Sequence, residues 1–195
     1  GTQIRPGGKY PSSTVLLART RRYDWYTEHG CAMKSPSPDA LEIEIVKSYD
    51  LPAIASLHAI CFEDSWRAEL LGQILSARGA FGLFSRPSGN AVGFILCRSS
   101  GQEGEILSLA VAPSLRRSGL GSALLEAAIT HATEQAIEAL FLEVAEDNAA
   151  ARRLYQKFGF AIVGRRSKYY RRRYGPSVDA LTLRCKLKLA GPREN

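Results

Sequence analysis

From residue 41 onward the sequence alternates between strand patterns and helix patterns, which limits the fold to a layered α/β or α+β structure. Residues 42–46 alternate charged and apolar side chains, which predicts a strand. Asp50 stands where it can cap a helix whose apolar residues follow at helical spacing: Ile54, Leu57, His58 and Cys61. Further patterns predict helices over 66–77, 118–135 and 148–158, and strands over 80–85, 91–98, 105–111, 139–145, 160–165 and 179–187. The pattern is typical of one mixed α/β domain.

Residues 1–40 lack such a period, because glycine pairs and Pro-Ser stretches interrupt it. We interpret them as an N-terminal extension, in part derived from a tag or from a start upstream of the natural one, for which Met33 is a candidate. The alternative is an ordered arm. The predicted domain spans residues 41–190, and residues 191–195 form a C-terminal tail.

The charge balance favours anionic partners without selecting one. Lys and Arg number 26 against 19 Asp and Glu, which gives a net charge of +7. The four cysteines are far apart in the sequence and form no CxxC pair, so we expect free thiols and no metal site. Apolar runs are too short to span a bilayer, and the N-terminal region lacks the apolar core of a signal peptide. A cytoplasmic protein without a membrane segment is therefore expected.

The most informative segment covers residues 107–121. A predicted strand ends at Pro113, Arg116 and Arg117 follow in a loop, and Gly119 and Gly121 stand where the next helix begins. Backbone N–H groups at a helix start have no intrahelical acceptor, and glycine permits a close approach of phosphate. The segment is neither a P-loop nor a dinucleotide fingerprint, because the Lys-Ser/Thr pair and one glycine are missing. It predicts an anion-binding loop, and close packing of the helix start is the alternative.

A second informative segment covers residues 139–160. Glu143 shares a strand face with Phe141 and Ala145, so its carboxylate stands at an otherwise apolar strand end, where its pKa can be raised. Asn148 is a good helix N-cap. Helical spacing places Tyr155 on the buried face of the following helix, together with Ala151, Leu154 and Phe158. Glu143 is a candidate base, and the alternative is a solvated strand end beside a tyrosine that only packs.

Taken together, the two segments resemble the GNAT superfamily of acetyl-CoA-dependent N-acetyltransferases. Its signature Arg/Gln-x-x-Gly-x-Gly/Ala matches Arg116-x-x-Gly119-x-Gly121, and the resemblance covers about residues 41–187. Shorter motifs are similar to the branch that acetylates the N-terminal alanine of a ribosomal small-subunit protein: Leu142-Glu143-Val144, Asn148-Ala149-Ala150-Ala151, Leu154-Tyr155, Gly159-Phe160, Cys61-Phe62 with Ser65-Trp66, and Tyr169-Tyr170 with Asp179-Ala180. The extension before residue 41 and the basic run 171–173 depart from that pattern.

The resemblance implies the fold and a set of roles. The sheet would be central, mostly antiparallel, flanked by helices, and splayed between the strand ending at Val111 and the strand carrying Glu143. Acetyl-CoA would be the donor, without a metal. Glu143 would be the general base and Tyr155 the general acid. The acetyl-CoA site would comprise Leu109, Ala110 and Val111 at the pantetheine arm, Arg116, Arg117, Ser118, Gly119, Leu120, Gly121 and Ser122 around the pyrophosphate, and Asn148.

The chemistry agrees with these roles, while the acceptor stays open. An α-amine has a pKa near 7.7–8.0, so much of it is protonated at neutral pH, and a base must remove a proton before or after the attack on the thioester. A backbone N–H at Val111 would stabilise the oxyanion. We expect a protein N-terminus as acceptor, with a ribosomal protein as a possible partner, and a small amine as the alternative. Residues 165–174 combine basic side chains with tyrosines, so a third hypothesis is a non-catalytic ribosome- or RNA-binding module. A solvated wall of a peptide groove is the preferred interpretation of that run, and nucleic acid is the less favoured partner.

Overall fold

The computed structural model describes residues 42–87, 90–172 and 175–188. The predicted extension over 1–40 and the tail over 191–195 lie outside the described residues. The elements follow the sequence prediction, except that β6 extends to Tyr170 where the predicted strand ended at residue 165, and the mixed α/β class is confirmed. They are β1 (Ile43–Ile45), α1 (Leu51–Cys61), α2 (Ala68–Ser76), β2 (Ala80–Ser85), β3 (Gly93–Ser100), β4 (Glu103–Val111), α3 (Leu120–Glu134), β5 (Ala139–Ala145), α4 (Ala149–Lys157), β6 (Ala161–Tyr170) and β7 (Val178–Lys186), with short 3-10 turns η2 (Ser48–Asp50) and η3 (Pro113–Leu115).

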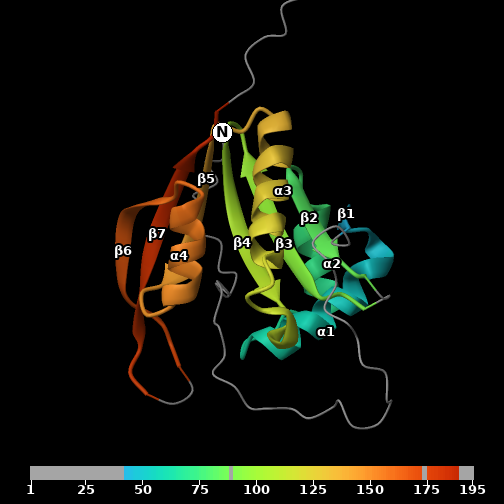
Figure 1. The fold of residues 1–195 in the computed structure, drawn as a ribbon, viewed down its shortest axis with the longest axis horizontal. Coiled ribbons are helices and arrows are strands. Elements are labelled where there is room, and N and C mark those ends of the chain that lie inside the picture. The colour runs from blue at the N-terminus through green and yellow to red at the C-terminus, as the bar shows by residue number, and fades with distance from the viewer. Residues whose placement is uncertain (1–41, 88–89, 173–174, 189–195) are drawn as a thin grey trace, which may run out of the picture.

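The strands form one sheet in the order β1-β2-β3-β4-β5-β7-β6, in which only the β4–β5 pair is parallel. That pair is short, because it extends only from Glu103 opposite Ala139 to Glu105 opposite Phe141. Beyond it the two strands diverge (Figure 1). In the described part of the chain, residues 106–111 of β4 therefore pair with β3 on one edge and with no strand on the other. The predicted splay is confirmed.

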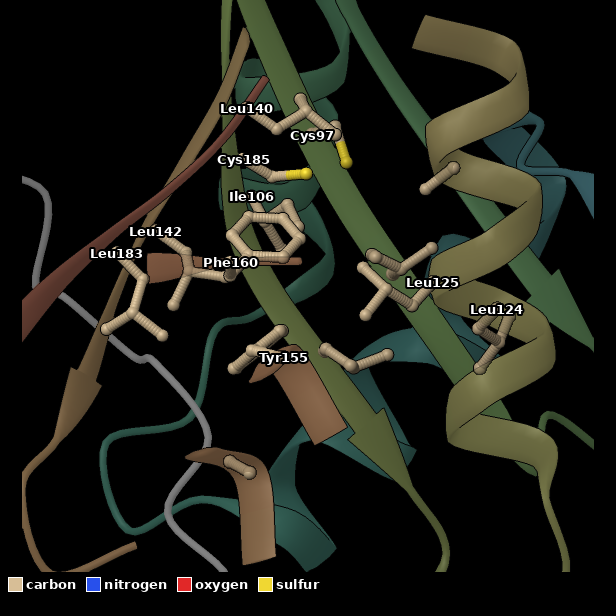
Figure 2. Packing of buried hydrophobic residues seen from close by; sticks show 14 of the residues in the cluster. Cys97, Ile106, Leu124, Leu125, Leu140, Leu142, Tyr155, Phe160, Leu183 and Cys185 are labelled. Carbon is tan, nitrogen blue, oxygen red and sulfur yellow. The ribbon is translucent and has the colours of Figure 1, made fainter. Parts of the chain in front are cut away.

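Two apolar clusters hold the helices on opposite faces of the sheet. Buried residues of α1 and α2 pack on one face against Phe84, Phe94 and Leu96. Buried residues of α3 and α4 pack on the other face, and Figure 2 shows part of this second cluster, including Leu124, Leu125, Tyr155, Phe160 and Leu183. Because β5, β7 and β6 continue the sheet beyond β4, the open edge of β4 lies inside the sheet rather than at its outer edge.

The sequence prediction for Asp50 is corrected by the structure. Asp50 precedes α1, but its carboxylate accepts no bond from that helix. Instead it accepts from the Lys47 N–H at 2.9 Å and from Arg86 at 2.8 Å, and the residue is only 3% exposed. The reason is local: Asp50 ends the turn η2 in a helical backbone conformation, whereas a capping side chain needs an extended one. Asp50 therefore fixes the turn before α1.

His58 is buried beside the α1–α2 cluster, which agrees with its predicted place on the apolar face of the first helix. Its side chain has no exposed surface, and its Nδ1 accepts a hydrogen bond from the Trp66 N–H at 3.2 Å. The ring stacks on Trp66 with centroids 5.0 Å apart and contacts Phe62 at 4.3 Å. Burial lowers the pKa of His58 from 6.5 to about 4, because the imidazolium form would lose its hydration.

We therefore predict that burial of His58 makes the free energy of unfolding decrease at acidic pH. Between pH 6.5 and about 4 the unfolded state binds a proton that the folded state does not, so the free energy of unfolding falls as pH decreases across this window. The loss reaches up to about 3 kcal/mol. Urea unfolding of wild type and His58→Gln from pH 4 to 7.5 measures it, with His131→Gln as control. Equal slopes in wild type and His58→Gln would contradict the assignment.

Candidate functional site

A cavity of about 440 Å³ lies at the open edge of β4. Its size falls within the range of small-molecule and cofactor sites. Its walls come from the end of α1, the end of β4, the loop before α3, the start of α3, and α4: Cys61, Phe62, Leu109, Ala110, Val111, Leu115, Arg116, Arg117, Gly119, Gly121, Ser122, Ala150, Ala151, Arg153, Leu154 and Lys157. The site therefore forms where β4 separates from β5.

The loop before α3 contains two residues with positive φ angles. Arg117 and Gly119 have positive φ angles of 70° and 92°, and Gly119 occupies the N-cap position of α3. Residues in left-handed conformation next to ordinary ones direct successive N–H groups to one side. A Cβ at Gly119 would meet nothing within 4 Å, so glycine is required there by backbone conformation rather than by space. These features fit the predicted anion-binding loop, residues 116–122.

Gly121 lies between β4 and α4. A Cβ built on it would be 3.6 Å from Leu154 Cδ2 and 3.7 Å from Val111 Cγ2, which are ordinary contact distances. A methyl group at residue 121 would thus bring the first turn of α3 into contact with the end of β4 and with the middle of α4. Any side chain larger than alanine at residue 121 would extend from this junction into the space that the cavity occupies.

Two donors fix the end of β4. The Val111 carbonyl accepts from Arg116 Nε at 3.3 Å and from the Cys61 thiol at 3.6 Å. Burial raises the pKa of Cys61, and the nearby Arg116 opposes that change only in part. Cys61 is therefore a thiol that donates, not a thiolate. Among described residues the cysteines Cys61, Cys97 and Cys185 are all free and buried.

Most of the predicted acetyl-CoA residues line the cavity, and three do not. Those that line it are Leu109, Ala110, Val111, Arg116, Arg117, Gly119, Gly121 and Ser122. The hydroxyl of Ser118 donates to the Leu115 carbonyl at 2.7 Å, and the side chain of Leu120 is buried in the core. Asn148 accepts from the Ala151 N–H at 3.1 Å and so caps α4, as its sequence context predicts. The structure thus gives these three side chains contacts within the protein.

The sequence analysis missed the wall that α4 contributes. Its residues follow a helical stripe beside the buried one: Ala150, Arg153, Leu154 and Lys157. The helical spacing of these residues, together with the cations Arg153 and Lys157, was the sequence feature that could have predicted this wall. With Arg116 and Arg117 these make four cations, and the lining residues include no carboxylate. The cavity is therefore suited to an anionic ligand. Cys61 and Phe62 also line it, although they are distant in sequence from the signature loop.

Glu143 is placed on β5 with only 13% of its side chain exposed, and it forms an ion pair with Arg166 Nε at 3.0 Å. The expectation of an otherwise apolar strand end is therefore wrong. The sheet register explains the difference, since Ala145 and Arg166 both pair with Ala180 on the intervening strand β7. The guanidinium on β6 is thereby brought close to the end of β5. Glu143 itself is not among the residues that line the cavity.

Tyr155 is fully buried on α4, as the helical spacing predicts. Its ring lies 5.5 Å from the ring of Phe160 (Figure 2). Its hydroxyl has no hydrogen-bond partner among the described residues. Burial raises the pKa of this phenol, so the hydroxyl stays protonated at neutral pH. Ala151, one turn before Tyr155 on the same helix face, and Leu154, its neighbour in sequence, both line the cavity.

Three of the five described cations between residues 165 and 172 form ion pairs within the chain, and one of them is Arg166, which pairs with Glu143. Arg165 forms ion pairs with Glu146 and Asp179, and Arg172 pairs with Asp147. A phosphate backbone would have to compete with these carboxylates, which disfavours the RNA hypothesis. Across the described ranges no three potential ligands gather as a metal site. Within the same ranges no helix is long and apolar enough to cross a membrane.

Known proteins resemble this chain in sequence and in structure. It is 34% identical over 96 residues to the "[Ribosomal protein bS18]-alanine N-acetyltransferase" of Haemophilus influenzae, covering 49% of this chain and 65% of that protein. It is 31% identical over 141 residues to the "N-alpha-acetyltransferase RimI" of Mycobacterium tuberculosis, covering 69% and 85%. The crystal structure of the ribosomal-protein-S18-alanine N-acetyltransferase of Escherichia coli matches with a TM-score of 0.71 and 27% identity, over 79% and 98% of the two chains.

The family model described as "Acetyltransferase (GNAT) family" matches residues 51–160, which include α1, the signature loop and α4. This segment contains the residues that line the cavity. The match covers more than half of the 195 residues. The chain belongs to the acetyltransferase (GNAT) family.

Proposed function

We propose that this acetyltransferase moves an acetyl group from acetyl-CoA to the N-terminal α-amine of a protein. The observation that carries the proposal is the cavity itself. It joins the unpaired edge of β4 to a loop whose backbone suits a pyrophosphate, and four cations line it. A long ligand with an amide-rich arm and an anionic end matches both parts. The N-terminal acceptor is supported by the relatives named for bS18-alanine and N-alpha acetylation.

The end of β4 and the loop before α3 would each bind a different part of acetyl-CoA. The open edge at Leu109, Ala110 and Val111 offers backbone groups to the amides of the pantetheine arm, in the way that one strand binds another. The N–H groups of residues 117–122 would bind the pyrophosphate at the positive end of α3. The acetyl thioester, which supplies the acyl group, would then lie near Val111, whose N–H could stabilise the oxyanion.

Glu143 would remove the proton from the acceptor amine, directly or through water. The ion pair with Arg166 holds its carboxylate in a defined position at the end of β5. The amine then attacks the thioester without an acyl-enzyme intermediate, so no cysteine nucleophile is needed, and Cys61 keeps its role at the end of β4.

Tyr155 would donate its proton to the departing CoA sulfur. Burial keeps the phenol protonated, and the hydroxyl has no acceptor among the described residues that would compete for the proton. Tyr155 does not itself line the cavity, but it lies next to two residues of the cavity wall, and the proposed role requires its hydroxyl to reach the ligand from there.

The acceptor is tested with peptides and small amines in one assay. We expect release of free CoA with peptides that carry a free N-terminal alanine, and mass spectrometry should place the acetyl group on the α-amine. The same peptides with a formylated N-terminus are the control. Turnover with small amines alone would replace the proposed acceptor, and tight RNA binding without any turnover would support the non-catalytic alternative.

Gly121→Val is predicted to weaken acetyl-CoA binding at least about tenfold, because its branched side chain would block the N–H groups of the loop. Gly121→Ala is the matched control, since a single methyl group fits at contact distance. Calorimetry with acetyl-CoA measures the effect, and thermal unfolding verifies that both variants are folded. Wild-type affinity in a folded Gly121→Val protein would refute the loop assignment.

Glu143→Gln and Tyr155→Phe are predicted to lower turnover by roughly 100- to 10,000-fold while leaving acetyl-CoA affinity nearly unchanged. Loss of the base should be most severe at low pH, where most of the amine is protonated. Loss of the acid should slow release of the thiol. The measurements are turnover from pH 6 to 9 and thermal stability. Wild-type turnover in a folded Tyr155→Phe enzyme, with an unaltered pH profile for Glu143→Gln, would refute both roles.

A further inference from the structure

We propose that Arg153 and Lys157 bind the 3′-phosphate of coenzyme A and make the enzyme select the complete cofactor over its 3′-dephospho form. This inference rests on the proposed acetyl-CoA site and deepens it. Both residues lie on α4, one helical turn apart, and both line the cavity. They are not among the residues that the sequence predicts to bind acetyl-CoA, and they are not proposed to transfer a proton, as Glu143 and Tyr155 are.

The two side chains are available for an anion. Neither Arg153 nor Lys157 forms an ion pair with a described carboxylate, and both are exposed on the cavity side of α4. The ammonium of Lys157 lies 5.7 Å from the centre of the Phe158 ring, a contact that leaves its N–H donors free. Arg152 on the same helix differs, because it donates to the Glu146 carbonyl at 2.9 Å and is not part of the cavity wall.

The charges of the cavity exceed what a pyrophosphate requires. At the loop, backbone N–H groups and Arg117 already face the position proposed for it, while Arg116 is directed to the Val111 carbonyl. The pair on α4 therefore has no partner in that part of the ligand. A phosphate monoester carries about 1.5 to 2 further negative charges at neutral pH. Coenzyme A has one such group, on the ribose that its pyrophosphate joins to the pantetheine arm.

The packing of α4 places the pair at a suitable position. Leu154, between the two cations in sequence, lies 3.6 Å from the position of a Cβ at Gly121. The helix therefore passes directly beside the loop proposed to bind the pyrophosphate. The 3′-phosphate is separated from the pyrophosphate by a few bonds of the ribose, so cations on the adjacent turn of α4 are within its reach. Arginine can bind such a phosphate through two parallel N–H donors, and lysine adds a point charge.

The experiment measures dissociation constants of CoA and 3′-dephospho-CoA by calorimetry at fixed salt. Wild type should bind CoA about tenfold or more tightly than the dephospho form. Arg153→Gln and Lys157→Gln should each weaken CoA binding about three- to tenfold and change binding of 3′-dephospho-CoA less than about twofold. The double variant should bind the two ligands equally. Arg152→Gln is the matched control, because it removes the same charge from the same helix and should leave the ratio of the two constants unchanged.

Two outcomes would overturn the inference while the acetyl-CoA site stands. Equal affinity of wild type for both ligands would show that the 3′-phosphate is not recognised. Equal weakening of both ligands by Arg153→Gln and Lys157→Gln would assign the pair to the pyrophosphate or to the general field of the cavity. Failure of the proposed function looks different: wild type would then bind neither ligand, or Gly121→Val would leave CoA binding intact.

Discussion

The separation of β4 from β5 is the constraint on which the site depends. Their parallel pairing ends at Glu105, so residues 106–111 keep the backbone donors and acceptors of one edge without a partner strand. Buried backbone groups of this kind require hydrogen bonds from elsewhere. Helices cover both faces of the sheet, and the cavity is lined by Leu109, Ala110 and Val111 at the end of this edge. A ligand with amide groups of its own is a suitable partner.

Hydrogen bonds from neighbouring segments hold the end of β4 in place, and positive charge is concentrated around the cavity beside it. Donors from α1 and from the loop converge on the Val111 carbonyl, which ties the end of β4 to both segments. The positive end of α3 and the cations of the loop and of α4 lie around the same cavity. An extended ligand is therefore expected to bind in one orientation, with its anionic end at the start of α3.

Much of this fold was predictable from local patterns, because strand alternation, helical spacing and the glycine-rich helix start depend on residues close in sequence. The cap at Asn148 and the burial of Tyr155 followed from the same rules. The remaining features depend on tertiary contacts. The ion pair of Asp50 with Arg86 is one of them, because Arg86 comes from the turn after β2. Likewise, the pairing of Glu143 with Arg166 depends on the register of β7, which no local pattern specifies.

The hydroxyl of Tyr155 illustrates how stability and function can be separated. A buried hydroxyl without a partner costs about 1–3 kcal/mol, and phenylalanine would fill the same space without that cost. Its neighbour Phe160, with the ring centroids 5.5 Å apart, supplies only apolar contacts (Figure 2). Packing alone would therefore favour phenylalanine at residue 155. A tyrosine there is better explained by a ligand that supplies the missing partner, and the CoA sulfur of the proposed reaction is such a partner.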